Sequence, residues 1–203
     1  MPTKIDLRSR YKGVYSAMKE PSLIKIPSLS AFAIDGTGDP TNSPRFRTCV
    51  EALYAASYTL KFALKKERGF DWGVLGLEGE WWCDNIEEFS MDRRGDWLWS
   101  LFIVQPEEVS EAETNSAIAA AKKKKGLPAL DELRFERRPA HEAAHILHLG
   151  SYDAESPTIE RLHAFIGASG LRLAGHHREI YLNDARRTDP AKLKTIIRQP
   201  VVR

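Results

Sequence analysis

Hydrophobic and polar positions along the chain follow two different periods. Between residues 22 and 105, a partly alternating apolar stretch is followed by a run with apolar residues at steps of three and four, and then by two more short apolar stretches. A period of two predicts a strand, and a period near 3.6 predicts a helix. The first half therefore predicts strand, helix, strand and strand at Ser22 to Asp35, Arg45 to Arg68, Asp71 to Trp82 and Asp96 to Gln105.

Local signals mark where these elements end. Ser43 and Pro44 suit the N-cap and the first turn of the long helix, and Asp35 to Pro40 is a turn-forming run. A charged stretch, Asp84 to Gly95, predicts a hairpin-like connection between the two later strands.

The second half repeats the same order of patterns after an Ala-rich segment. Glu107 to Lys125 has an acidic start and a basic end, which suits the dipole of an inserted surface helix. Ser156 and Pro157 mark the start of a further helix that runs to about Gly167. We expect strands at Leu133 to Arg138 with Ala143 to Ser151, read as one interrupted strand, and then at Arg172 to Leu182 and Leu193 to Val201.

The two halves also resemble each other in sequence, because Phe102 to Pro106 ends in the same Gln-Pro pair as Ile196 to Pro200. We therefore predict an α+β fold of tandem β-α-β-β repeats with pseudo-twofold symmetry, an antiparallel sheet and a central ligand cleft. The predicted boundaries are an N-terminal arm at 1–21 and one domain at 22–203, divided into a first half at 22–106, an inserted helix at 107–130 and a second half at 131–203.

Composition favours an ordinary globular protein with a small-molecule partner. Thirty Lys and Arg stand against 28 Asp and Glu, a net charge of +2 that does not indicate nucleic acid. Cys49 and Cys83 have no metal or disulfide spacing, and no stretch reaches the about 18 apolar residues of a membrane span. We expect a cytoplasmic monomer or weak dimer without a cofactor and without a membrane or nucleic-acid partner.

Several motifs suggest chemistry that their context does not support. His141 to His145 matches the HExxH zinc pattern, but Pro139 precedes it and a strand-like run follows, whereas the motif needs a helix. His176 and His177 are interpreted as the start of a strand, and Lys122 to Lys125 as charge at a helix end. We expect no metal site, and the absence of a GxSxG motif argues against acyl transfer.

A carboxylate within an apolar strand is the strongest candidate for chemistry. Glu179 and Tyr181 share one face of their predicted strand by period two. If that face lines a cavity, we expect burial to raise the pKa of Glu179, and the carboxylate could accept a proton, orient water or pair with a cation. A solvent-exposed Glu179 is the alternative, and the same choice applies to Glu80.

Aromatic residues are concentrated on the predicted elements around the cleft. As single residues they suit a core or an interface, but as a set they suggest a flat or bulky organic ligand. The candidates are Tyr54, Tyr58, Trp81, Trp82, Trp97, Trp99, Tyr152 and Tyr181.

Taken together, several segments resemble the GyrI-like small-molecule-binding domains, of the SHS2 type. The resemblance implies the tandem β-α-β-β arrangement, a central pocket and a glutamate at Glu179. The segments that carry it are Ile34 to Pro40, Ala52 to Phe62, Leu77 to Trp82, Glu179 to Leu182 and Leu193 to Pro200.

The chain looks most similar to free-standing members of that family that hydrolyse cyclopropanoid genotoxins of the yatakemycin type. The resemblance implies that Glu179 activates water, with Tyr58 and Trp99 beside it and Tyr152 and Trp82 completing an aromatic sandwich. Glu80 stands where the family pattern has an apolar residue.

Three functions remain open at this point. One is the hydrolase, the second is a non-catalytic protein that binds or sequesters hydrophobic, cationic drugs, and the third is a gyrase-interacting inhibitor. A DNA-binding regulator is not expected, because only about twenty residues precede the first predicted strand.

Overall fold

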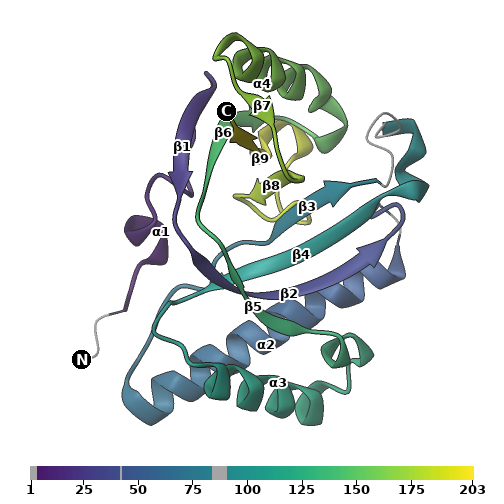
Figure 1. Ribbon diagram of the computed structural model, residues 1–203. Coiled ribbons are helices and arrows are strands. Elements are labelled where there is room, and N and C mark those ends of the chain that lie inside the picture. The colour runs from purple at the N-terminus through teal and green to yellow at the C-terminus, as the bar shows by residue number, and fades with distance from the viewer. Residues whose placement is uncertain (1–3, 42, 84–90) are drawn as a thin grey trace.

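The structure is a computed structural model that describes residues 4–41, 43–83 and 91–203. Its helices and strands follow one another along the chain as Figure 1 shows. The helices are α1 (Leu7–Arg10), α2 (Pro44–Arg68), α3 (Glu111–Lys125) and α4 (Ser156–Ala168). The strands are β1 (Ser22–Ile26), β2 (Leu29–Thr37), β3 (Glu78–Trp82), β4 (Leu98–Gln105), β5 (Arg134–Arg138), β6 (His141–Leu149), β7 (Arg172–Leu173), β8 (His177–Tyr181) and β9 (Lys194–Val202).

All strand pairs of the sheet are antiparallel, and the sheet curls around its middle (Figure 1). The order across the sheet is β1-β6-β9-β8-β3-β4-β2-β5, with β7 paired to β9 alone. One β-α-β-β unit contains β2, α2, β3 and β4, and the other contains β6, α4, β8 and β9. The units meet where β3 pairs with β8, so the predicted α+β fold of tandem repeats is confirmed.

The strand before each unit crosses to the other unit, which the sequence did not reveal. β1 precedes β2 but pairs with β6, and β5 precedes β6 but pairs with β2. The prediction of one strand over Ser22 to Asp35 is therefore wrong, and so is the prediction of one interrupted strand after Leu133. Pro27 and Pro139 lie at the two breaks, where the missing backbone N–H and the fixed φ of proline interrupt a strand.

The other predicted strands are shorter than their apolar patterns. The strand expected from Asp71 begins at Glu78, and the one expected from Arg172 divides into β7 and β8. Residues 84–90 of the predicted hairpin-like stretch lie outside the described residues, and Met91–Asp96 form a 3₁₀ helix.

The three long helices agree closely with their predicted limits. Ser43 caps α2 by accepting a hydrogen bond from the N–H of Phe46, and Pro44 occupies the first turn. Ser110 and Glu113 form a reciprocal capping box at the start of α3. These local contacts explain why the helix ends can be read directly from the sequence.

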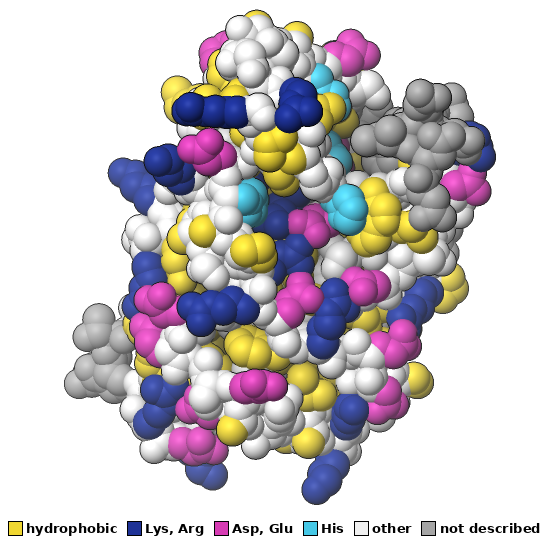
Figure 2. Space-filling model, in the orientation of Figure 1, with side chains coloured by type: hydrophobic (Ala, Val, Ile, Leu, Met, Phe, Trp, Pro, Cys, Tyr) yellow, Lys and Arg dark blue, Asp and Glu magenta, His cyan; other side chains and the backbone are white. Residues whose placement is uncertain are grey.

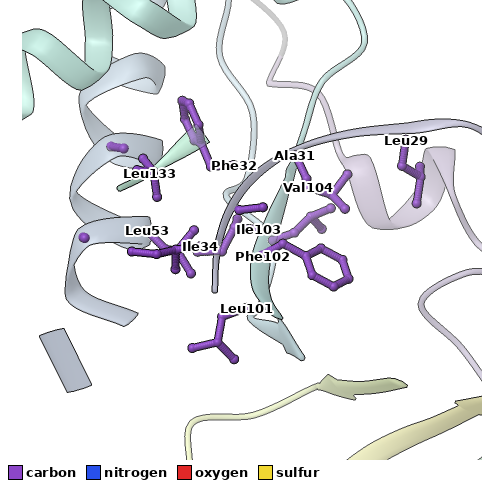
Figure 3. Packing of buried hydrophobic residues seen from close by; sticks show 14 of the residues in the cluster. Leu29, Ala31, Phe32, Ile34, Leu53, Leu101, Phe102, Ile103, Val104 and Leu133 are labelled. Carbon is purple, nitrogen blue, oxygen red and sulfur yellow. The ribbon is translucent and has the colours of Figure 1, made fainter. Parts of the chain in front are cut away.

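Helices cover one face of the sheet, which we call the helix face. α2 packs against β2 and β4, with α3 beside it, while α4 packs against β6 and β9 (Figure 1). Figure 3 shows Leu53 of α2 against Ile34, whereas Phe102 points to the other side of β4. β3 and β8 therefore lie between the regions that the two helices cover.

Residues of the predicted N-terminal arm pack into the protein. Leu7, Val14 and Tyr15 are buried in the main hydrophobic core. The hydroxyl of Tyr15 donates a 2.8 Å hydrogen bond to Glu78 on the face of the sheet opposite the helices. Arg198 donates to the carbonyl of Val14.

The HExxH match lies within β6, so His141 and His145 are on an extended strand, as expected. The helical geometry that the zinc motif requires is therefore not present. Among the helices of the described part of the chain, none combines the length and the apolar character that crossing a bilayer requires.

Candidate functional site

Glu179 lies at the centre of the sheet, on the helix face. In the strand register Glu179 is opposite Gly79 of β3 and Ile197 of β9. Directly paired residues point to the same face, and Ile197 packs beneath α4. The carboxylate therefore lies where the two repeats meet, between the regions that α2 and α4 cover.

The carboxylate of Glu179 is almost enclosed, since its side chain is 15% exposed. The hydroxyl of Tyr181 donates a 2.7 Å hydrogen bond to Oε2, and Nε2 of His177 lies 3.3 Å from Oε1. Burial by itself would raise the pKa of Glu179, but the hydrogen bond and charge of His177 and the hydrogen bond of Tyr181 together lower it. The predicted phenol neighbour is present, while the predicted upward shift of the pKa is wrong for this residue.

Glu155 is a second acid at this site, and the sequence did not indicate it. Glu155 is only 3% exposed, and its carboxyl group interacts with that of Glu179. Burial, and then the charge of Glu179, raise the pKa of Glu155 well above its ordinary value. These opposite shifts favour a single proton shared by the two carboxyl groups, with Glu155 binding it more tightly than Glu179.

Two buried oxygens at this position have no hydrogen-bond partner within the described chain. They are Oε1 of Glu155 and Oγ1 of Thr195, which is opposite Tyr181 in the register of β8 and β9. The hydroxyl of Thr195 lies close enough to the carboxyl group of Glu155 to lower its pKa, although no hydrogen bond of normal geometry joins the two groups. Buried polar atoms normally have partners, so the site suits a ligand or water that supplies them.

Tyrosines surround the two acids. The rings of Tyr152 and Tyr181 meet edge to face with 5.5 Å between centroids. Burial, followed by the charges of Glu179 and Glu155, raises the pKa of Tyr152 to about 12, so its hydroxyl keeps its proton. Tyr54 stacks on Tyr58 along α2, and Tyr54 interacts with the backbone of Leu77, whose carbonyl accepts the N–H of Tyr181.

Tyr58 is more open than the other tyrosines. It is 45% exposed and stacks on Phe62, which is 58% exposed. The two rings form an accessible aromatic surface on α2.

Tryptophans share the helix face with Glu179, because Trp81 and Trp99 are opposite each other in the register of β3 and β4. Trp81 is opposite His177 in the register of β3 and β8 and contacts Phe46 and Trp97. Trp81 and Trp97 are both buried. They belong to the apolar packing beside the acids.

Other predicted site residues lie elsewhere. Trp99 is wholly buried in contact with Gly36, and together with Trp82 it lines a separate hollow of ≈ 420 Å³ that does not include Glu179 in its lining. Glu80 points to the face opposite Glu179, where it forms ion pairs with Arg138 and Arg178. The structure therefore brings Tyr152 and Tyr181 to Glu179 and places Trp81 on the same face. Tyr54, Trp82, Trp99 and Glu80 do not reach the carboxylate.

No group of three or more His, Cys, Asp and Glu side chains within residues 4–41, 43–83 and 91–203 is arranged to hold a metal ion.

Comparison with known proteins identifies the family. The chain matches the GyrI-like small molecule binding domain over residues 19–202. It belongs to the GyrI-like family. No curated protein matches the chain in sequence.

Several solved structures are similar to this protein over nearly its whole length. An uncharacterized conserved protein from Listeria innocua is 32% identical with a TM-score of 0.90, and the match covers 98% of this chain and 100% of that one. A hydrolase from Listeria innocua is 31% identical with a TM-score of 0.85 over the same shares of both chains. The C-terminal domain of EcmrR is 16% identical with a TM-score of 0.55, covering 91% of this chain and 98% of that domain, and shows the fold alone.

Proposed function

We propose that this GyrI-like protein binds a hydrophobic or aromatic organic molecule over Glu155 and Glu179 and hydrolyses a strained, cyclopropane-bearing compound. The observation that supports this most is the pair of adjacent buried acids, whose pKa values are shifted in opposite directions, beside buried oxygens without partners. Adjacent acids with separated pKa values are a common arrangement for transferring protons at neutral pH. The 31% identity to a protein called a hydrolase supports an enzymatic function.

In this mechanism Glu179 orients a water molecule and accepts its proton while the water oxygen bonds to a carbon of the strained ring. The carbon–carbon bond of the ring breaks, and its electron pair passes to the other ring carbon or to a group conjugated with it. Glu155 donates a proton there, and the proton held by Glu179 then returns to Glu155. The net reaction adds one water molecule and leaves both acids as they began.

The surrounding side chains support these roles. Tyr181 donates to Glu179, and His177 lies beside it, so the carboxylate keeps its charge although it is nearly enclosed. Tyr152, with its proton retained, presents an aromatic edge and a hydroxyl beside the acids. Tyr54 and the exposed Tyr58 provide flat surfaces on α2 for an aromatic ligand.

The experiment separates binding from chemistry. Wild type is incubated with a yatakemycin-type compound, and the product that is one water heavier is followed by mass spectrometry, while affinity is measured by calorimetry. We expect Glu179→Gln, which keeps the size of the side chain, to lower turnover at least about a hundredfold and to change affinity much less. The matched control is Glu160→Gln, which replaces an exposed acid on α4 and should leave turnover and affinity unchanged.

A second function has its own support in the charge of Glu179, which suits a cationic hydrophobic ligand that is bound and not converted. If wild type forms no product but binds a cationic aromatic dye, and Glu179→Gln weakens that binding, the protein sequesters ligands and the hydrolytic part is refuted. Equal behaviour of wild type and Glu179→Gln in both assays would remove Glu179 from the function.

A further inference from the structure

A second hollow lies on the face of the sheet opposite Glu179. Its volume is ≈ 410 Å³, within the size range of sites for small organic ligands. Figure 2 shows a depression with a histidine on each side and with basic and acidic side chains at its floor. The lining residues are Glu80, Glu136, Arg137, Arg138, Pro139, His141, Gly175, His176, Arg178 and Pro200.

Two arginines of this hollow are held in fixed positions. Arg138 and Arg178 each form an ion pair with one oxygen of Glu80. Their guanidinium carbons also lie 4.1 Å and 5.0 Å from the ring centroid of Phe102. Arg178 is only 3% exposed. An arginine fixed in this way loses little side-chain freedom when it binds a ligand.

Positive charge lies close to one wall of the hollow. The lining contains Arg138 and Arg178 together with Glu80 and Glu136, and the fully buried Arg198 is opposite Arg178 in the register of β8 and β9. Burial, and then the charges of Arg178 and Arg198, lower the pKa of His141 at this wall, although Glu80 acts in the other direction.

Two buried N–H groups in this lining have no acceptor in the described part of the chain. They are Nη1 of Arg178 and Nε of Arg138. Buried N–H groups of charged side chains that lack an acceptor are unfavourable, and an anion placed beside them would supply it. Neither the acids at Glu179 nor the aromatic residues on α2 contribute to this lining.

The shape and chemistry of the walls narrow the class of ligand. A planar guanidinium group fits the two oxygens of a carboxylate or phosphate. Pro139 and Pro200 form apolar parts of the wall, and the ring of His176 stacks on Trp82 with 4.1 Å between centroids and 9° between planes. Such walls suit a flat apolar body attached to the anionic group.

We propose that this hollow binds a small organic anion, of the aromatic carboxylate class, through Arg178 and Arg138. The site is separate from Glu179, so it adds a second ligand to the one proposed above and does not depend on that function. An organic anion held here would lie on β3 and β8, the same two central strands that carry the Glu179 site on their other face.

Calorimetry with benzoate as the probe tests the proposal. We expect one benzoate to bind per chain. Arg178→Lys keeps the positive charge but loses the two parallel N–H donors of the guanidinium group, and it should weaken benzoate binding about tenfold. Arg138→Lys keeps the charge of the second arginine and should also weaken binding, several-fold. Arg161→Gln removes the same charge from α4 and should bind benzoate as wild type does.

Inorganic phosphate, which has no flat body, is expected to bind at least about tenfold more weakly than benzoate. The proposal is overturned if folded wild type does not bind benzoate, or if Arg138→Lys and Arg178→Lys bind it as tightly as Arg161→Gln does. Equal affinity for phosphate and benzoate would overturn the assignment to an organic ligand. Glu179→Gln should leave benzoate binding unchanged, and this result would distinguish the hollow from the Glu179 site on the other face of the sheet.

Discussion

The protonation of Glu155 makes a prediction about stability that can be worked out in advance. Glu155 keeps its proton in the folded protein to well above 4.5, the ordinary pKa at which the unfolded chain loses it. The folded state then binds more protons than the unfolded state, so the free energy of unfolding falls as pH rises through this window. Gln at the same position stays neutral in both states and does not contribute to this fall.

The size of the effect follows from one proton. Each pH unit lowers the stability of wild type by about 1.4 kcal/mol relative to Glu155→Gln. Between about pH 5.5 and about pH 7.5 the difference between the two proteins should therefore shift by about 2.7 kcal/mol, in favour of the variant at the higher pH. Titrating groups that lie away from the acid pair are present in both proteins and cancel in the difference.

Urea unfolding of wild type, Glu155→Gln and Glu160→Gln at both pH values measures this shift. Glu160 is exposed on α4, and its replacement should leave the pH dependence of wild type unchanged. If the stabilities of wild type and Glu155→Gln change in parallel between the two pH values, Glu155 is ionised in the folded protein and the reasoning is wrong.

Three further predictions concern the fold. Glu80→Gln removes the negative charge shared by two buried arginines and replaces one of their two acceptor oxygens with an NH2 group, so it should lower the free energy of unfolding by about 3 kcal/mol, measured by urea unfolding at neutral pH. In wild type the arginines hold the pKa of Glu80, which burial would raise, at about 2, so this stabilisation is present above the ordinary pKa and is lost as pH falls toward 2. Gly36→Ala would place a Cβ 2.0 Å from Cη2 of Trp99 and should lower stability by about 2 kcal/mol, whereas Gly73→Ala meets no atom within 4 Å and should not, as thermal unfolding can show. Ser110→Ala removes one half of the capping box of α3 and should lower stability by about 1 kcal/mol, and an unchanged melting temperature would contradict the role of the cap.

Much of the fold could be predicted because its helices carry local signals. Ser43 with Pro44 and Ser110 with Glu113 mark helix starts through contacts within one turn, so no distant part of the chain is needed to interpret them. The repeat of strand and helix patterns led to the correct fold class for the same reason.

The exchange of β1 and β5 between the repeats could not be predicted in this way. Which strand pairs with which depends on contacts between distant segments, and an apolar run that spans Pro27 can be read as one strand or as two. The site shows the same limit. Period two places Glu179 with Tyr181, but only the register opposite Gly79 shows that Glu80 points the other way.

Glu155 could not be recognised because it precedes a helix and follows no periodic pattern. It reaches Glu179 through the packing of α4 and its N-terminal loop on the sheet. Its burial beside another acid raises its pKa, and the sequence alone contains neither fact.

The central claim is that Glu179 is ionised and Glu155 is neutral at the point where the two repeats meet. Carboxyl ¹³C NMR of glutamate-labelled protein tests it, with Glu155→Gln and Glu179→Gln used to assign the two signals. We expect the Glu155 signal to remain that of a protonated acid through neutral pH and the Glu179 signal to remain that of a carboxylate to below its ordinary pKa of 4.5. Two signals that both titrate near 4.5, or a proton found on Glu179 at neutral pH, would contradict the account.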